Sequence, residues 1–414
     1  MRPKDWDPMP SFSGLTVVCL ASYFKGVDFL RQCHEHGCRV VLIVKEKLRD
    51  EDWPRDALDQ FITVPDSATG DVFLDTVTAL ARTRRLDRIV ALEEYDVVHA
   101  ATIREHLRIP GMGSTTARLF RDKLAMRVKA LEAGVRVPDF VHVLNEDELR
   151  GYMQAVPPPW VLKPRMDVSA IGIRKIHDPA LVWQAIEALD ARPALHERSS
   201  YYLLERFVPG AVFHVDSLVQ DGEVIFAGVN RYWRPPMEVA HKGGVFVTCT
   251  VEHGSADERA LLSMNTALLK ALRFVRGATH AEFIQGEADG EFYFLEVAAR
   301  VGGAYIAETL QAATGISIWR EWANIELARD QVPYHLPAHV NDYAGVALAL
   351  ARQEWPDTSA FDDPEIVHRV RKRHHVGLIV RSPSYARVQH LLGTYADRIT
   401  RDHLAVLPPL ERAE

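Results

Sequence analysis

The first hundred or so residues alternate between short apolar runs and helix-like segments, and no other feature restricts the fold as strongly. In chain order, the two kinds of segment stand at 15–21, 25–37, 39–44, 61–65, 71–84, 87–92 and 96–107. Apolar strands joined by helices are typical of parallel sheets that are covered on both faces. We therefore predict an open, doubly wound α/β domain over residues 1–113. No GxGxxG motif follows the first strand, so a dinucleotide site is not supported.

After residue 113 the pattern changes to hairpins. Asp221-Gly222 and Asp289-Gly290 each stand between two alternating runs and are typical of hairpin turns. We predict one larger α+β domain in two parts and a small closing α+β domain, with boundaries at 114–198, 199–333 and 334–414.

The charge balance and hydropathy exclude several classes of partner. The chain has 414 residues and a formal charge of -7, so it offers no general basic field to nucleic acid or to an acidic membrane. The basic run at 368–375 has no stacking platform beside it and is read as a solvated hairpin. No run reaches about 18 apolar residues, and the start lacks an apolar signal core. We expect a cytoplasmic protein that binds neither nucleic acid nor membrane, and we leave a homodimer open.

Two lysines stand where a positive charge is costly unless an anion joins it. Lys163 ends the apolar strand WVLKP, and Lys123 lies in a helix opened by RDK. The loop DVSAIG beyond Lys163 contains Ser169 and Gly172, whose backbone N–H groups can cover phosphate oxygens. Either lysine alone is more often a snorkelling surface residue. Together with such a loop they indicate a phosphate-binding site.

Two acidic residues, Glu282 and Glu296, lie on strands joined by the hairpin at Asp289-Gly290. Their separation across the turn allows them to be cross-strand neighbours on one face. Two like charges in contact are unfavourable unless a cation lies between them. Mg²⁺ takes one or two carboxylates and completes its shell with water and phosphate oxygens. We predict a magnesium site here; the alternative is two solvated strand ends.

Arg300 stands four residues beyond Glu296, at the exit of the same strand. Its planar fork suits phosphate or carboxylate oxygens, and it can reach a phosphoryl group that the metal holds. Gly302 and Gly303 would let the backbone approach a ligand closely. The alternative is that Arg300 simply pairs with a neighbouring acid.

The segment at 230–246 is rich in aromatic and cationic side chains and has no regular pattern. An irregular loop of this kind is a reasonable place for substrate recognition. We predict that Arg231, His241 and Lys242 bind a substrate carboxylate there. A plain exposed loop is the alternative.

Taken in order, these motifs resemble the ATP-grasp superfamily, and within it the carboxylate-amine ligases of the L-amino-acid ligase type. The matching stretches lie between about 110 and 330 and read RDK, VLKP, DVSAIG, LLERFVPG, VD, HAEF and LEVAAR before GG. Their order and spacing carry the resemblance. It implies a pre-ATP-grasp domain at 1–113 and an ATP-grasp fold at 114–333.

The resemblance also implies roles for single residues. One group would bind ATP through two lysines on the phosphates, a loop that closes over them and a hinge strand whose backbone reads adenine. In that order its members are Lys123, Lys163, Ser169, Gly172, Glu205, Arg206, Phe207 and Val208. Glu282 and Glu296 would coordinate Mg²⁺, or Mn²⁺ in its place. Arg300, with Lys163, would act on the transferred phosphoryl group and steady the acyl phosphate.

The chain departs from the family pattern at two positions. Ala298 stands where many members have Asn, two residues after the second metal-binding Glu. Val212 stands where a ribose-binding Glu often follows the hinge. His214 or Asp216 would then hold the ribose, or the ribose is held differently.

The implied reaction couples a carboxylate, an amino acid or a related acid, to an amine at the expense of ATP. Transfer of the γ-phosphoryl group makes an acyl phosphate, and the amine displaces phosphate to leave an amide or peptide bond. A biotin-carboxylase-like enzyme is one alternative, against which the short DVSAIG loop argues. A non-catalytic nucleotide-binding regulatory module is another, against which the retained lysines, glutamates and Arg300 argue.

Overall fold

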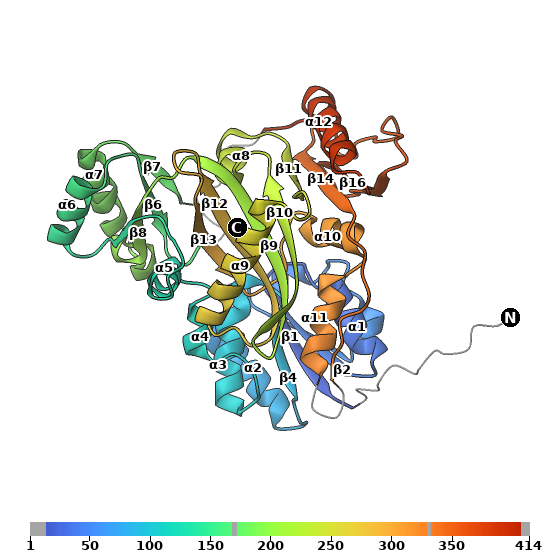
Figure 1. The fold of residues 1–414 in the computed structure, drawn as a ribbon. Helices are drawn as coiled ribbons and strands as arrows, with labels where there is room; N and C mark the ends of the chain where they lie inside the picture. Colours follow the sequence, from blue (N-terminus) through green and yellow to red (C-terminus); the bar gives the residue numbers. More distant parts are fainter. Residues whose placement is uncertain (1–13, 168–171, 329–332, 407–414) are drawn as a thin grey trace.

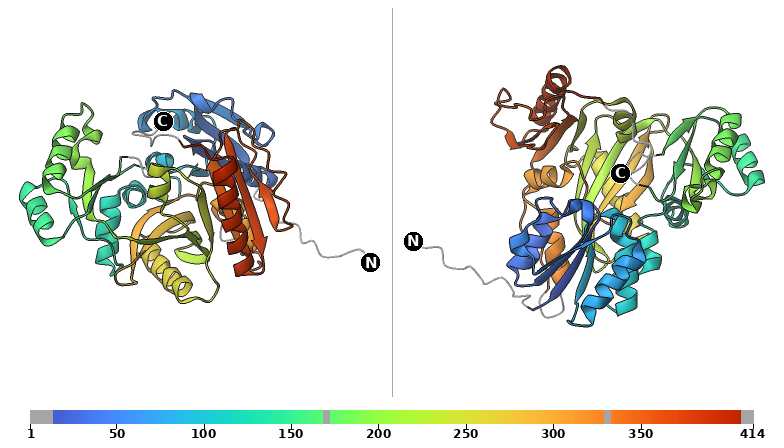
Figure 2. Two further views of the ribbon diagram at one scale, coloured as in Figure 1. Left: turned by 90° about the horizontal axis from the view of Figure 1, so that it is seen from above. Right: turned by 180° about the vertical axis from the view of Figure 1, so that it is seen from behind.

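The computed structural model describes residues 14–167, 172–328 and 333–406, whose strands form three sheets (Figures 1 and 2). The first sheet is parallel and has the order β3-β2-β1-β4. Its strands and helices are β1 (Thr16–Ala21), α1 (Val27–Glu35), β2 (Arg39–Lys45), β3 (Gln60–Val64), α2 (Gly70–Ala81), β4 (Arg88–Ala91) and α3 (Val97–Leu107). The open parallel sheet that the alternation predicts is thus confirmed.

Both faces of this parallel sheet are covered. Val18, Leu20 and Ile43 pack with the α2 and α3 side chains in one apolar cluster. Side chains of the opposite face, such as Val17 and Leu42, pack with α1 and with α11 (Ile318–Leu327), which comes from much later in the chain. Every residue of β1 is buried. The sheet can therefore present polar groups only beyond the ends of its strands.

The second sheet forms an outer lobe, drawn in green in Figure 1, and is antiparallel with the order β5-β8-β6-β7. The elements of this region are α4 (Ser114–Arg118), α5 (Lys123–Glu132), β5 (Phe140–His142), α6 (Glu146–Ala155), β6 (Trp160–Pro164), β7 (Arg174–Ile176), α7 (Pro179–Asp190) and β8 (Tyr202–Arg206). Helix α5 begins where the Asp122 carboxylate accepts the N–H of Leu124 at 3.0 Å, a typical N-cap. This cap fixes the start of the helix that carries Lys123.

The third sheet is antiparallel throughout and has the order β13-β12-β9-β10-β11-β14-β16-β15. Its strands are β9 (Gly210–Gln220), β10 (Glu223–Tyr232), β11 (Phe246–Thr250), β12 (Gly277–Gly286), β13 (Phe292–Ala298), β14 (Tyr343–Leu350), β15 (Ile366–Arg369) and β16 (His375–Ser382). The accompanying helices are α8 (Pro236–Lys242), α9 (Ala256–Ala271), α10 (Ile306–Thr314) and α12 (Tyr385–Asp402). Because β14 is hydrogen-bonded to β11, the C-terminal strands continue this sheet. The division into domains stays a prediction.

Two hairpins set the register of the central strands. Asp221 (φ 51°) and Gly222 (φ 85°) link β9 to β10 in the left-handed conformations that a tight two-residue turn requires. The second hairpin joins β12 to β13 through a longer loop that contains Asp289 and Gly290 (φ 71°). Both predicted hairpins are confirmed.

The two faces of the central sheet have different neighbours. Phe213 and Val215 of β9 pack in one cluster with side chains of α9, and α9 lies across this face in Figure 1. Leu218, on the other face because strand side chains alternate, packs with Leu310 of α10 and Ile318 of α11. His214 and Asp216 share this second face, on which the candidate site is built.

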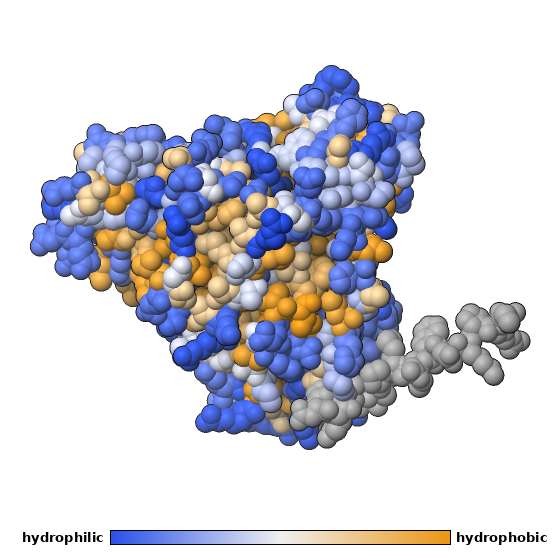
Figure 3. All heavy atoms as spheres, viewed as in Figure 1, coloured by the Kyte–Doolittle hydropathy of each residue, from blue (hydrophilic) through white to orange (hydrophobic). Residues whose placement is uncertain are grey.

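Apolar residues are distributed unevenly over the helices and the surface. Within the described ranges, none of the helices combines the length and the apolar character needed to cross a bilayer. Figure 3 shows mostly hydrophilic residues over the lobe of α6 and α7 and around α12, whereas apolar residues gather near α9 and its neighbouring strands.

Candidate active site

The predicted acidic pair lies in register on the central sheet. Glu282 of β12 is the direct cross-strand partner of Glu296 of β13, and Glu282 is also paired with His214 of β9. Directly opposed residues of antiparallel strands place their side chains on the same face. The side chains of Glu282 and Glu296 keep 17% and 31% of their exposure, so a ligand can still reach them.

The two predicted lysines approach this acidic pair from the outer lobe. The Nζ atom of Lys123 lies 3.0 Å from Oε2 of Glu296 and donates to the Asp167 carbonyl at 2.6 Å. Lys163 forms an ion pair with Glu205. Burial lowers the pKa of Lys163 to about 8, against the opposing effect of Glu205. Burial alone would raise the pKa of Glu296, but Lys123 and Lys163 lower it.

Arg127 is a site residue that the sequence analysis missed. Its guanidinium is fully buried, with Nη2 3.0 Å from Glu205 Oε2, and it also donates to the Leu295 carbonyl. Glu205 therefore lies between two cations, Lys163 and Arg127. The available signal was the spacing of four residues from Lys123, which puts both cations on one face of α5.

The predicted hinge runs from Glu205 to Val208 and offers a partly free backbone. The N–H groups of Arg206 and Phe207 donate to the carbonyls of Asp139 (2.8 Å) and Pro159 (3.0 Å). Among the described residues, the N–H of Val208 has no acceptor. Val208 packs in an apolar cluster whose other buried members are Val212, Tyr232, Ile284, Tyr293 and Ile306. A free donor beside an apolar patch suits a flat heteroaromatic base.

Arg300 pairs with acids that come from the parallel sheet. Its Nη2 lies 3.1 Å from Glu94 Oε2, and its Nε lies 3.7 Å from Glu93 Oε1. The Glu94 carboxylate also binds Arg121. Arg300 therefore pairs with acids in the structure, as the alternative interpretation held. These acids, however, stand more than two hundred positions away in the sequence. Sequence reasoning missed Glu93 and Glu94 for that reason.

These acids lie beyond the carboxyl ends of the parallel strands. Glu93 follows β4 and forms an ion pair with Lys25, which follows β1. Strand order reverses between β1 and β4, and such switch points are where open α/β sheets bind ligands. A Cβ atom added to Gly303 would lie 3.9 Å from the Lys25 ammonium. Lys25 and the Gly-Gly turn after Arg300 therefore lie close together.

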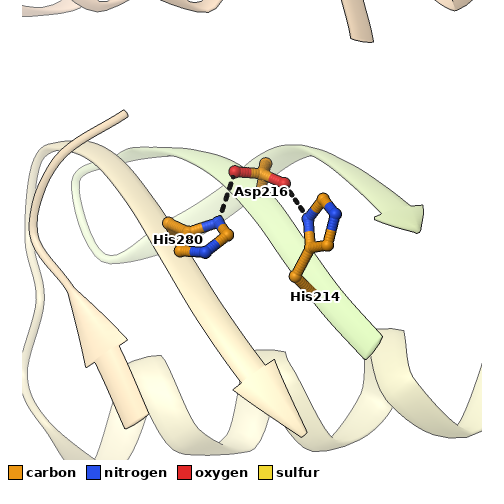
Figure 4. A group of neighbouring side chains, drawn as sticks. All are labelled: His214, Asp216 and His280. Atoms are coloured by element: carbon orange, nitrogen blue, oxygen red, sulfur yellow. Dashed lines mark hydrogen bonds and ion pairs between the residues drawn. The ribbon is translucent and has the colours of Figure 1, made fainter. Parts of the chain in front are cut away.

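His214, Asp216 and His280 form a buried hydrogen-bonded cluster beneath this turn (Figure 4). Asp216 uses both carboxylate oxygens, one with His214 Nδ1 at 2.6 Å and one with His280 Nδ1 at 2.9 Å. Burial alone would lower the pKa of His280, but Asp216 raises it to about 9, and burial lowers the pKa of His214. The cluster extends to Glu282, whose Oε1 lies 3.6 Å from His280 Nε2.

This buried cluster of His214, Asp216 and His280 supports the acidic pair and is not itself interpreted as a metal site. The three ligand atoms lie within 4.8 Å of one another, yet each is already engaged. A Cβ atom added to Gly302 would lie only 2.8 Å from Asp216 Oδ1, so no space is left on that side. His214 and Asp216 are both buried, and a contact of either with a ribose stays a prediction.

The remaining predicted residues are not brought to the acidic pair. Arg231 is exposed on the sheet face opposite His214, since it follows Asn230, the cross-strand partner of His214, by one residue. His241 and Lys242 lie in helix α8, where the sequence indicated an irregular loop, and Lys242 is 3.5 Å from Glu238. Both side chains are exposed.

The predicted phosphate loop is described only at its edge. Ser169 lies outside the described residues. Gly172 has φ 71° and borders β7. Its left-handed backbone explains the glycine, since side-chain-bearing residues rarely adopt that conformation. Its role over a phosphate stays a prediction.

Comparison with known protein families agrees with this geometry. Residues 156–308 match the ATP-grasp domain, and residues 30–111 match the ATP-grasp N-terminal domain. The first of these ranges contains Lys163, the hinge, both glutamates and Arg300. The chain therefore belongs to the ATP-grasp proteins, as the order of its motifs indicates.

The sequence is also similar to that of an individual curated protein. The chain is 26% identical over 245 residues to the L-arginine-specific L-amino acid ligase of Bacillus subtilis, covering 59% of this chain and 58% of that relative. It thus spans less than two thirds of the relative's length.

Two solved structures share the fold. The L-amino acid ligase from Bacillus licheniformis has a TM-score of 0.73 and 18% identity, covering 93% of this chain and 98% of that one. The biotin carboxylase domain of Hydrogenobacter thermophilus 2-oxoglutarate carboxylase, crystallised with MgADP and bicarbonate, has a TM-score of 0.69 and 16% identity, covering 91% and 88%. At such identities the likeness is one of fold.

Proposed function

We propose that this protein is an ATP-dependent carboxylate-amine ligase that activates an amino acid or a related acid as an acyl phosphate and couples it to an amine. One observation carries the proposal. The in-register carboxylates Glu282 and Glu296 meet the ammonium of Lys123, 3.0 Å from Glu296, with Lys163 buried close by. Such a concentration of fixed opposite charges suits a polyphosphate and the cation that accompanies it.

ATP would lie between the outer lobe and the central sheet. Lys123 and Lys163 would bind its phosphates, and the free N–H of Val208 would donate to the adenine ring beside the apolar cluster of Val212 and Ile284. The ion pairs that both lysines form with carboxylates keep the cations oriented before the nucleotide arrives. Preorganised charge of this kind is effective because it needs no reorganisation during the reaction.

The donor set fits a magnesium ion. Glu282 and Glu296 supply two hard carboxylate oxygens on a rigid hairpin, and Tyr232 donates to Glu282 at 2.9 Å, which fixes the orientation of that carboxylate. These two residues would hold the ion. When bound, Mg²⁺ would neutralise charge that develops on the phosphate oxygens.

The acid substrate would bind near Arg300, beside the charged groups that follow the strands of the parallel sheet. Its carboxylate oxygen would attack the γ-phosphorus of ATP, and the bond to the β-γ bridging oxygen would break. ADP would depart as the leaving group, and the acid would become an acyl phosphate. Arg300, held by Glu94 at 3.1 Å, is oriented to stabilise that group. An amine then attacks the acyl carbon and expels phosphate. Lys25 and Glu93 would supply one charge of each sign, which suits the zwitterion of an amino acid.

The test is phosphate release measured across a grid of amino acids and amines, with product masses determined. We expect release of one phosphate per amide formed for at least one pair. Bicarbonate-dependent phosphate release without an amide would favour a carboxylase-like enzyme instead. ATP binding with no turnover for any pair would favour a nucleotide-binding regulatory module.

A further inference from the structure

A cavity lies between the parallel sheet and the segments around Phe274, Ala299 and Trp322. Its volume is about 380 Å³, within the usual range for small-molecule sites. One wall is β4, which is an edge strand of its sheet. Its lining includes Arg104, Arg273, Phe274, Ala299 and Trp322.

The polar lining of this cavity is strongly cationic. Four arginines line it, Arg88, Arg104, Arg273 and Arg276, against one acid, Glu326. The Glu326 carboxylate already accepts the Trp322 indole N–H at 3.0 Å. Arg276 is also neutralised, because its Nη2 lies 3.1 Å from Asp221 Oδ1. The cavity still has more cationic than acidic side chains in its lining.

Arg104 is oriented by neutral partners. It donates to the carbonyls of Met112 (3.0 Å) and Ile89 (2.7 Å), and within the described ranges no carboxylate lies in ion-pair distance. Burial lowers its pKa, against the opposing effects of Glu326 and Glu105. The two carbonyl contacts use two of the five N–H donors of a guanidinium. Arg104 is half-buried, so its spare donors lie where an anion that enters the cavity can reach them.

We propose that this cavity is a binding site for a small organic carboxylate with a flat apolar body. The carboxylate binds Arg104 and Arg273, and the apolar body lies between Phe274 and Trp322, both of which are buried. Inorganic phosphate fits the cations but leaves these apolar walls in contact with water.

The position of the cavity gives its ligand influence over the candidate active site. Ala299 lines the cavity and precedes Arg300, and Ala91 lines it two residues before Glu93. The ligand therefore contacts both segments that bring Arg300 to its acids. This regulatory consequence rests on the proposed function, whereas binding at the cavity does not.

The test is calorimetric titration of the whole protein with benzoate, with benzamide as the neutral isostere. We expect benzoate to bind with a Kd on the order of 1 mM or tighter, and benzamide at least tenfold more weakly. Arg104→Gln should weaken benzoate at least tenfold, since a charge-assisted hydrogen bond is lost. Arg82→Gln, which changes an exposed arginine directly after α2, is the matched control and should leave the Kd unchanged.

Further variants locate the bound benzoate and guard against misfolding. Arg273→Gln alters an exposed side chain at the rim and should weaken binding at least threefold. Trp322→Phe should remove the change in tryptophan fluorescence that accompanies binding. Arg300→Ala should keep the wild-type Kd; benzoate binding that is lost in Arg300→Ala and kept in Arg104→Gln would overturn the proposal. So would equal affinities for benzoate and benzamide, or no saturable binding.

Discussion

The parallel sheet and the central antiparallel sheet contribute to the candidate site in opposite ways. Strand β1 of the parallel sheet is wholly buried, and its functional neighbours Lys25, Glu93 and Glu94 come only after strand ends. The central sheet instead places Glu282 and Glu296 within paired strands. The parallel sheet supplies functional groups from the ends of its strands, and the antiparallel sheet supplies them from its face.

The cause of this difference is how many faces each sheet must bury. A parallel sheet is covered by helices on both sides, so a charge within a strand would be buried without water. An antiparallel sheet can leave part of one face open. Substitutions in strands of the first sheet should therefore change stability, and substitutions on the open face of the second should change chemistry.

The largest expected effect tests the face of the central sheet. We expect Glu296→Gln to fold normally and to lose ATP-dependent coupling by a factor on the order of 10³, because a charge that organises the phosphate site is removed. Phosphate release measures the rate, and circular dichroism checks the fold. Glu287→Gln, an exposed position in the loop of the same hairpin, is the control. Full activity in Glu296→Gln would refute the assignment.

The next effect tests the buried face of the parallel sheet. Leu20 is fully buried in β1, so Leu20→Ala should lower the free energy of unfolding by about 3 kcal/mol through lost packing and a cavity. The kcat of the folded protein should stay within about twofold. Denaturant titration gives the stability, with the exposed Val367→Ala on β15 as control. A large fall in kcat without loss of stability would contradict the comparison.

Arg300 joins the two sheets and gives an intermediate case. Arg300→Lys keeps the charge but loses the planar fork that contacts Glu93 and Glu94, so we expect kcat to fall about tenfold. Arg300→Ala should lose coupling by about 10²-fold or more. Steady-state kinetics with saturating ATP would distinguish them. Equal rates for Lys and Ala would show that charge at this position is irrelevant.

The pH dependence of kcat/KM for ATP should follow the ionisation of Lys163. Its pKa is lowered to about 8, so in the free protein it loses its positive charge as pH rises through that value. The phosphates of ATP then lose a cationic partner, and kcat/KM for ATP should be halved near pH 8 and fall about tenfold by pH 9. Lys163→Arg stays charged and should remove this decline. A decline that persists in Lys163→Arg would assign it to another group.

The smallest expected effect lies at a helix end far from the chemistry. Ser255 caps α9 by accepting the Glu258 N–H at 3.1 Å, so Ser255→Ala should cost about 1 kcal/mol of unfolding free energy. Ser263→Ala, an exposed position within the same helix, is the matched control and should not destabilise. Thermal denaturation measures both. Activity should be unchanged in each.

Local patterns were sufficient to predict much of the fold. The first strand was expected at 15–21 and is Thr16–Ala21, and the helix expected at 96–107 is Val97–Leu107. The pairing of Glu282 with Glu296 was predictable because a single hairpin joins their strands and its connection sets the register. Each of these features depends on residues that are close together in the chain.

Features that depend on distant segments could not be predicted. Arg300 meets Glu94 across 206 positions, and β11 pairs with β14 across about a hundred. Periodicity carries no information about such contacts. Helix α8 was missed for a different reason, because its seven residues are too few to show a helical repeat.

The bond between β11 and β14 limits how this protein can be shortened. A chain ending before β14 would leave β11 with a row of unsatisfied backbone donors and acceptors. Such an uncovered margin recruits strands from other molecules, so the truncated form should precipitate even if its catalytic groups stayed intact. The last strands therefore act as a seal on the sheet that holds the site.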